Sequence, residues 1–502
     1  MKTYICKNCD YILNADYIED NYKCPKCGFG KENLTIVEEK LAENEIDAII
    51  DSIIEIENVK NNEKIINTNE NSNYVEISEK NKSIQRLKDK CIKCGQCKKV
   101  CESIANISYN LNECNEPICI GCGSCILNCP TKAIIEKKDY ENVKKIIDSN
   151  DKIVIAIISP TVIAELAKNK NEKYEIIEKK LIECLKIIGF DYVFNSSFGA
   201  DINILEEVAE FIDRIKTNKK MPMLTGNCPS WIKYMQIYHP ELINNIVSCM
   251  NPIEIHSRVL KKYFSEKKGF DESKIVTVSI NTCTAIKNNI RENESFIDYS
   301  ITVNELNEML EDFDIKIDAQ IGKEYDNIVG EFSGSGLIFD ISGGQCESFI
   351  RTLYRIMTKK DLDIKLIEFK ELRGLKGIKE ANVIIKKMEI KVAVVQGMEN
   401  LEKLLKSDKF NRYHFIEVMN CVNGCVGGGG NIYSSINDQE NLIKDYSEII
   451  YSIDRKNVNR FSHNNKELKK MYKEYLQNPN SDKCKQLFSI KYENKSYKLK
   501  NK

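Results

Sequence analysis

Cysteine is the residue type whose number and spacing point most directly to chemistry in this sequence. The chain carries 21 cysteines in 502 residues, and many of them stand in C-x-x-C pairs. In an exported protein such cysteines suggest disulfides, but the start "MKTYICKNCDYIL" lacks the basic-then-apolar pattern of a signal peptide. In a reducing compartment the pairs indicate metal ligation, and soft thiolates select iron–sulfur clusters, zinc or copper(I). We therefore expect a soluble, cytoplasmic metalloprotein.

The first cysteine group lies at the start of the chain, in residues 1–36. Two knuckles, "CKNC" and "CPKCG", supply four thiols: Cys6, Cys9, Cys24 and Cys27. Each knuckle turns two sulfurs toward one point, so the pair predicts a tetrahedral site that suits zinc or a single iron. Over about 35 residues the segment resembles rubredoxin, with the shorter gap of forms appended to some redox enzymes. Iron is favoured over zinc because the next module resembles an electron carrier.

The second group is a doubled run of the form C-x-x-C-x-x-C-x-x-x-C. Such a pair of runs holds two [4Fe–4S] clusters, and the fourth cysteine of each run serves the other cluster. The pattern predicts one cluster on Cys91, Cys94, Cys97 and Cys129, and a second on Cys101, Cys119, Cys122 and Cys125. The module resembles bacterial two-cluster ferredoxins, which are α+β domains. Cys114 falls outside the pattern, and we interpret it as a spare thiol.

The third group gathers four cysteines from three separated segments. Cys228, Cys283 and Cys421 follow the strand-like runs "PMLTG" (222–226), "KIVTVSI" (274–280) and "HFIEVMN" (414–420). Open parallel sheets bind ligands beyond the carboxyl ends of their strands, so these thiols can meet at one site. Cys425 follows closely and precedes the glycines 427–430, which let the backbone approach a bulky object. The set could hold one more [4Fe–4S] cluster.

The segments around these four cysteines resemble [FeFe]-hydrogenases. "TGNCPSW", "TCTAIK" and "EVMNCVNGCVGGGG" are similar to that family's three signature segments, in the same order, and the likeness runs from about residue 88 to the C-terminus. The resemblance implies two α/β lobes closing on the H-cluster. Its cubane would be bound by the four cysteines, and Cys425 would also bridge to a two-iron subcluster carrying CO, cyanide and an aza-dithiolate. The resemblance adds three more cofactor-binding residues: Pro160, Gly428 and Gly429.

The first signature segment departs from the family at the position of its proton-relaying thiol, which is Asn227 here. A thiol with a pKa near ~8.5 can accept and release a proton, whereas an amide can only orient a water that does so. The resemblance carries over the rest of the family's proton path to Glu207, Glu210 and Arg214. The family's serine aligns with Val247. Proton transfer is therefore expected to be altered or slow.

The second segment departs at the lysine that hydrogen-bonds a cyanide ligand in the family. Ile286 stands at that position and Lys287 follows it, with Asn281 and Cys283 upstream. A shift by one residue turns a side chain by about 100° on a helix. Lys287 is then a weak candidate for the cyanide contact, and Asn281 is a second one. The resemblance adds Met419 to the catalytic candidates.

The strands and helices that must position these residues indicate a multidomain α/β protein. Strand-like runs at 152–158, 191–196 and 391–397 join the three named above, and helical stretches separate them. We expect four parts: a rubredoxin-like module (1–36), a helix with a flexible linker (37–88), a ferredoxin-like domain (89–148) and a hydrogenase domain with parallel sheets and a helical tail (149–502). Four cysteines match no motif and are expected to be small buried hydrophobes: Cys184, Cys249, Cys346 and Cys484.

Charge composition excludes some partners. Lys and Arg number 74 against 75 Asp and Glu, so bulk charge favours neither nucleic acid nor membrane. The resemblance implies reversible 2H⁺ + 2e⁻ ⇌ H₂, a ferredoxin or rubredoxin-type electron carrier, and hydrogenase maturation proteins. Two alternatives stay open: an H₂ or redox sensor with low turnover, and an iron–sulfur transfer or assembly protein without the two-iron subcluster. Catalytic direction, oxygen tolerance and oligomeric state are not predicted.

Overall fold

The structure is a computed structural model in which the chain divides into two compact units, Met1–Asn71 and Ser72–Lys502. It describes residues 2–6, 12–15, 17–25, 27, 30–37, 74–75, 77–107, 118–217, 219–292, 295–432 and 438–499. Cys9, Cys114 and most of the expected helix and linker at 37–88 lie outside the described residues. Within the described part, no helix combines the length and apolar character needed to cross a membrane.

The first unit contains a small antiparallel sheet in the order β2-β1-β3. Its strands are β1 (Lys2–Cys6), β2 (Ile12–Ala15) and β3 (Leu34–Val37), with the 3₁₀ turn η1 (Lys31–Asn33) before the last. Cys24 is buried and Cys27 is half-buried. The rubredoxin-like metal site stays a prediction.

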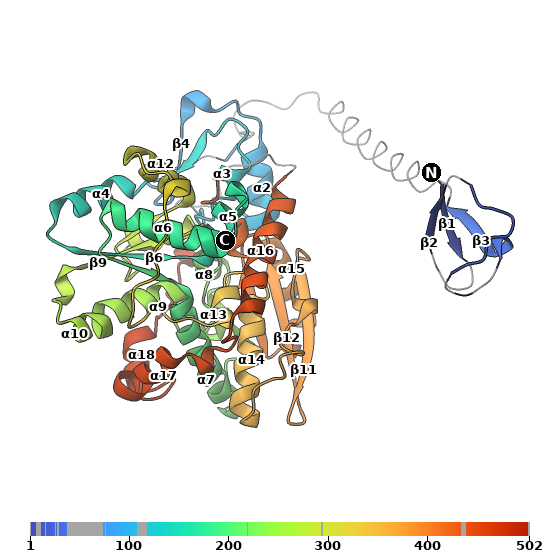
Figure 1. Cartoon of the computed structure of the whole chain (residues 1–502). Coiled ribbons are helices and arrows are strands. Elements are labelled where there is room, and N and C mark those ends of the chain that lie inside the picture. Colours follow the sequence, from blue (N-terminus) through green and yellow to red (C-terminus); the bar gives the residue numbers. More distant parts are fainter. Residues whose placement is uncertain are drawn as a thin grey trace. The chain divides into compact units, whose positions relative to one another are not determined.

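The second unit contains a fully parallel sheet in the order β10-β9-β6-β7 (Figure 1). Its strands are β6 (Ile153–Ile158), β7 (Tyr192–Asn195), β9 (Ile275–Ile280) and β10 (Tyr299–Ile301). β6 reads "IVIAII" because a strand with helices on both faces is buried on both sides and has no polar face. The sequence missed only β10 in this sheet.

A second sheet has the order β11-β12-β13-β8. β8 (Met223–Leu224), β13 (Phe415–Met419) and β12 (Met388–Gln396) run parallel, and β11 (Ile378–Ile385) forms an antiparallel hairpin with β12. β11 was not predicted. The expected strands at 222–226, 391–397 and 414–420 are confirmed, and the mixed α/β architecture with parallel sheets is that of the predicted class.

Helices separate and cover these strands (Figure 1). Those before the fourth signature cysteine are α4 (Tyr140–Ser149), α5 (Pro160–Lys170), α6 (Tyr174–Ile188), α7 (Ser197–Thr217), α8 (Pro229–Tyr238), α9 (Pro252–Val259), α10 (Ser265–Lys268), α11 (Ala285–Arg291), α12 (Val303–Asp312), α13 (Gly334–Ile338), α14 (Gly344–Thr358) and α15 (Met398–Leu405). The expected helical tail consists of α16 (Gln439–Lys456), α17 (Lys466–Met471) and α18 (Asp482–Phe488).

Residues 84–136 form a smaller substructure within the same unit. β4 (Ile84–Arg86) pairs with β5 (Ile134–Glu136) in antiparallel fashion, and α2 (Gln96–Ala105) packs against α3 (Ser124–Leu127). Two helices and a two-stranded ribbon suit the expected α+β ferredoxin-like domain, whose identity stays a prediction. Its apolar residues share a core with α8 and with the second sheet, so this part is packed onto the part that contains the two four-stranded sheets.

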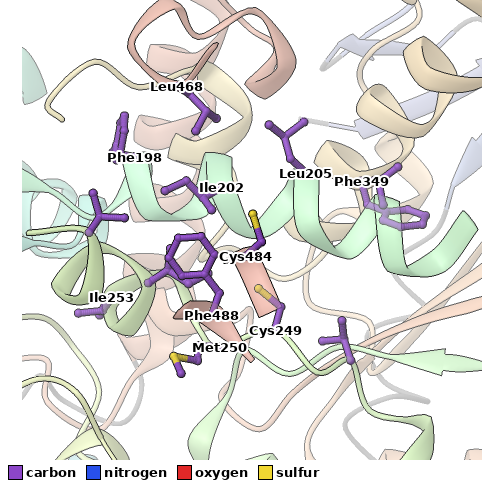
Figure 2. Packing of buried hydrophobic residues seen from close by; sticks show 14 of the residues in the cluster. Phe198, Ile202, Leu205, Cys249, Met250, Ile253, Phe349, Leu468, Cys484 and Phe488 are labelled. Carbon is purple, nitrogen blue, oxygen red and sulfur yellow. The ribbon is translucent and has the colours of Figure 1, made fainter. Parts of the chain in front are cut away.

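Helix α7 joins the cores of the two sheets. One apolar cluster contains Phe198, Ile202 and Leu205 of α7 together with strand residues from both sheets. Figure 2 shows Cys249 and Cys484 among the apolar side chains around this helix. As expected, the four cysteines outside the motifs are all buried: Cys184, Cys249, Cys346 and Cys484. A helix shared by two sheets fixes the spacing of the lobes.

A buried charge network ties the helices behind the second sheet. Arg351 of α14 is fully buried, and its Nη2 donates to Glu347 Oε1 (2.6 Å) and to Asp454 Oδ2 of α16 (3.0 Å). Its Nη1 donates to the Arg460 carbonyl at 3.1 Å. Arg373 also pairs with Glu347, and Arg460 with Asp454, so three guanidinium groups balance the charge of the two buried carboxylates.

Replacing Arg351 by Met should lower the free energy of unfolding by about 1.5–3 kcal/mol, because it removes one charged hydrogen-bond donor from each of two buried carboxylates. Each carboxylate keeps a second guanidinium partner, Arg373 for Glu347 and Arg460 for Asp454. The measurement is the urea midpoint under anaerobic conditions. Arg355→Met is the matched control, because Arg355 pairs with Asp361 at the surface, where ion pairs contribute about 0–1 kcal/mol. Equal midpoints for the two variants would contradict a structural role for the buried network.

Candidate functional site

Four cysteines line one cavity between the carboxyl ends of the two sheets. Cys228 follows β8 and is the N-cap of α8, Cys283 follows β9, and Cys421 and Cys425 follow β13. β9 belongs to the first sheet, whereas β8 and β13 belong to the second. The expected convergence of thiols at strand ends is therefore observed. We call this space the cluster cavity.

The chemistry of this donor set fits an iron–sulfur group. Burial raises the pKa of Cys283 to about 12, and the neighbouring Cys228 adds to the rise. Four thiols in one desolvated space become stable thiolates only when a bound metal supplies positive charge. Among the described residues, no three His, Cys, Asp or Glu side chains are placed to hold a single metal ion. The sulfurs surround a space, as ligands of a cluster do, and ligation stays a prediction.

Other groups on the wall of the cluster cavity were not predicted. They include Ser159, Asn251, Ile253 and Asp340. Ser159 Oγ donates to Asp340 Oδ2 at 2.8 Å, and burial raises the pKa of Asp340. Asn420, next to Cys421, buries both polar side-chain atoms without a hydrogen-bond partner in the described structure. Sequence spacing carries no signal for these residues, because separate loops bring them to the wall.

The glycine run packs against protein backbone. A Cβ added to Gly428 would lie 2.2 Å from the Thr282 carbonyl oxygen, and one added to Gly429 would lie 2.4 Å from Gly123 Cα. Gly428 also lines the cluster cavity. Gly429 meets the ferredoxin-like loop and is absent from the residues that line this cavity. Pro160 is the first residue of α5, where proline suits the helix start, and its neighbour Ser159 lines the cavity. Cofactor binding by Gly429 and Pro160 stays a prediction.

Two further cavities in the ferredoxin-like part sort its cysteines as the doubled pattern predicts. One is lined by Cys91, Cys94, Cys97 and Cys129. The other is lined by Cys101, Cys119, Cys122 and Cys125. The fourth cysteine of each run thus lies with the first three of the other run. This arrangement suits two cubanes, whose presence stays a prediction.

The second of these cavities adjoins the cluster cavity. Thr284, which follows Cys283, donates its hydroxyl to the Gly121 carbonyl at 2.6 Å. Gly123 and Gly429 approach each other so closely that neither tolerates a side chain without displacement. Negative charge on Cys228 and on Cys119 would raise the pKa of Cys122, after the larger effect of burial. The two sets of thiols are therefore electrostatic neighbours.

The two candidates for the cyanide contact have different surroundings, and the contact itself stays a prediction. Lys287 is fully buried, and its Nζ lies 2.7 Å from Glu305 Oε2 and 3.2 Å from Asp139 Oδ2. Ile286 lines the cluster cavity in its place. Asn281 also lines it, but its amide donates to Ser279 Oγ and Ser300 Oγ, both at 3.0 Å, and accepts from the Cys283 N–H at 2.7 Å. Asn281 therefore positions Cys283.

The remaining catalytic candidates fall into two places. Asn227 and Met419 line the cluster cavity. Glu210 accepts from Arg214 Nε at 2.9 Å and from the Ser248 hydroxyl at 2.7 Å. The sequence alignment put an apolar Val247 at the serine position, but Ser248, one residue later, supplies the hydroxyl. That one-residue shift is visible only in the fold.

Glu207 is the buried carboxyl group of the same helix. It accepts from Gln345 Nε2 at 2.7 Å, and its second oxygen has no hydrogen-bond partner among the described residues. Burial raises the pKa of Glu207 to about 8, although the hydrogen bond from Gln345 lowers it. A carboxyl group with this pKa can exchange protons near neutral pH.

Known proteins share this architecture. Residues 152–429 match the family described as iron only hydrogenase large subunit, C-terminal domain, and residues 440–495 match iron hydrogenase small subunit. Iron hydrogenase 1 of Clostridium pasteurianum is 34% identical over 442 residues, which cover 83% of this chain and 77% of that protein.

Two further likenesses bear on the site. A variant of the [FeFe]-hydrogenase HydA1 from Chlamydomonas reinhardtii has a TM-score of 0.62 at 28% identity, covering 71% of this chain and 98% of that one. The cytosolic Fe-S cluster assembly factor narfl of Danio rerio is 26% identical over 407 residues, which cover 73% of this chain and 95% of that protein. The first family match spans more than half of the sequence. The chain, whose two sheets deliver four thiols to one cavity, is a divergent member of the iron-only hydrogenase family.

Proposed function

We propose that the protein is an [FeFe]-hydrogenase that interconverts 2H⁺ + 2e⁻ and H₂. The observation that carries this proposal is the cluster cavity, where four thiols from three strand ends share a wall with Met419, Ser159 and Asp340. The wall of the cavity therefore includes residues beyond the four thiols. An iron–sulfur cube needs only the thiols, whereas a larger cofactor needs the additional wall.

The four cysteines and the cavity wall would have separate roles in binding the cofactor. Cys228, Cys283, Cys421 and Cys425 would hold the cubane of the H-cluster, and Cys425 would bridge to the two-iron subcluster. When bound, that subcluster with its CO, cyanide and aza-dithiolate ligands supplies the redox chemistry. The chain contributes ligation, a buried wall and proton delivery. Because Ile286 lines the cavity, it would offer a cyanide ligand no charge-assisted hydrogen bond, an interaction worth about 1.5–3 kcal/mol.

Electrons would enter through the ferredoxin-like part. The cavity lined by Cys119, Cys122 and Cys125 adjoins the cluster cavity. The contacts of Thr284 with Gly121 and of Gly429 with Gly123 support a short route between these two cavities. A rubredoxin-like head holding iron, or zinc, would be an additional entry point. A ferredoxin or a rubredoxin-type protein would be the external partner, maturation proteins would install the cofactor, and the cytoplasm would be the compartment.

Two other functions are alternatives to the hydrogenase proposal. An H₂ or redox sensor would keep the cofactor but turn over slowly, and Asn227 at the proton gate favours it. An assembly role, as named for the narfl relative, would need only the cubane. The retained Cys425 and the extended cavity wall favour the hydrogenase over the assembly role.

Infrared spectra of the anaerobically matured protein test the proposal. We expect bands of CO and cyanide ligands that shift reversibly when H₂ is added and removed. Cys425→Ser is the matched control: it should lose these bands because the bridge to the two-iron subcluster is removed, while the ferredoxin-like clusters keep their EPR signals. Absence of the bands in the unmodified protein, despite confirmed maturation and intact cubanes, would replace the hydrogenase by an electron-transfer or assembly protein.

The Asn227→Cys variant tests whether proton relay at this position limits H₂ turnover. The new thiol, with an ordinary pKa of ~8.5, can accept and release protons that the amide cannot. H₂ turnover should rise at least about tenfold, within the range of general acid–base catalysis. Asn227→Ala is the control, because it changes the same side chain without adding a titratable group. If the cysteine and alanine variants turn over at the same rate, proton relay at this position does not limit the reaction.

A further inference from the structure

A second cavity lies directly beside the cluster cavity. It has a volume of about 330 Å³, enough for a file of water molecules, and its wall mixes polar and apolar side chains. Asn227, Pro229 and Asn251 line both spaces, so these residues form the partition between them. The rest of the second cavity lies between α8, the start of α9 and the segment 489–495. We call it the side cavity.

Glu254 lines the side cavity from the first turn of α9. Asn251 caps this helix by accepting the Glu254 N–H at 3.1 Å, so the partition and the carboxylate are held together by one helix start. The other titratable groups that line the side cavity are Lys233, Lys491, Tyr492, Glu493 and Lys495. Burial, followed by the negative charge of Glu254, raises the pKa of Tyr492, so its hydroxyl stays protonated.

The route that the family resemblance implies has no titratable group at Asn227 in this chain. Further along that route Ser248 still donates its hydroxyl to Glu210 at 2.7 Å. Val247 is buried, and its Cγ1 would lie 3.0 Å from a Cβ on Gly226, so an apolar side chain packs against the residue that precedes Asn227. Glu207, behind it, has its one described hydrogen bond from Gln345, which is not a proton carrier.

We propose that protons reach the cluster cavity through the side cavity, with Glu254 as the proton carrier. The carboxylate takes a proton from water on the outer side and returns it to water on the side of the partition, so it is regenerated in each transfer. Asn227 and Asn251 orient the last water. This inference rests on the proposed hydrogenase function and adds the path for its substrate.

Isosteric variants test the route in the matured enzyme. Glu254→Gln removes the titratable group, and because its size is unchanged the CO and cyanide bands should stay intact. H₂ turnover should fall at least about tenfold and its pH profile should lose one ionisation. Glu207→Gln should cost less than Glu254→Gln. Glu266→Gln, on the exposed surface of α10, is the matched control and should leave turnover unchanged. A larger loss in Glu207→Gln than in Glu254→Gln would overturn the proposal.

A second readout does not need the two-iron subcluster. In protein that carries only its cubanes, ionisation of Glu254 across the partition should make the reduction potential of the cubane on Cys228 depend on pH, as followed by EPR. Glu254→Gln should flatten that dependence, whereas Glu266→Gln should leave it in place. Identical slopes in all three proteins would refute the link through the side cavity. Missing CO and cyanide bands would instead refute the proposed function, so the two failures are distinguishable.

Discussion

The desolvation of four thiols in one cavity is the constraint on which the rest of the structure depends. The thiolates are stable there only with bound metal, and the cavity exists only if two sheets present their strand ends to each other. Helix α7 maintains that geometry because its apolar residues belong to a core shared by both sheets. Arg351 and its carboxylates secure the helices behind the second sheet. Ligation chemistry thus depends on packing far from the cysteines.

Much of this arrangement could be predicted from local sequence. Continuous apolar runs marked six strands, and the doubled cysteine pattern sorted eight thiols into the two sets that the structure brings together. These signals are local, or they are carried by fixed spacing. The hairpin strand β11 and the short strand β10 were missed: β11 alternates exposed and buried residues, and β10 has three residues.

The errors concern side chains whose partners are distant in the sequence. Lys287 does not line the cluster cavity, because it forms ion pairs in the interior with Glu305 of α12 and with Asp139, which precedes α4. Ser248, and not Val247, donates its hydroxyl to Glu210 of α7, because the segment after the 3₁₀ helix Pro240–Asn245 turns Ser248 toward α7. Asp340 and Glu254 had no motif to reveal them. It is easier to predict from sequence which backbone segments meet than to predict which of their side chains face the site.

The glycine run faces two parts of the molecule. Gly428 lines the cluster cavity, whereas Gly429 meets Gly123 of the ferredoxin-like loop. Close contact between these loops brings two sets of thiols near each other, which under the proposed function would favour electron transfer between their clusters. Asn227 and Ile286, by contrast, change polar contacts around the cavity and leave every thiol in place. Under the proposed function, ligation and electron entry would be preserved, while the proton supply and the environment of the cofactor would be the properties that this chain has changed.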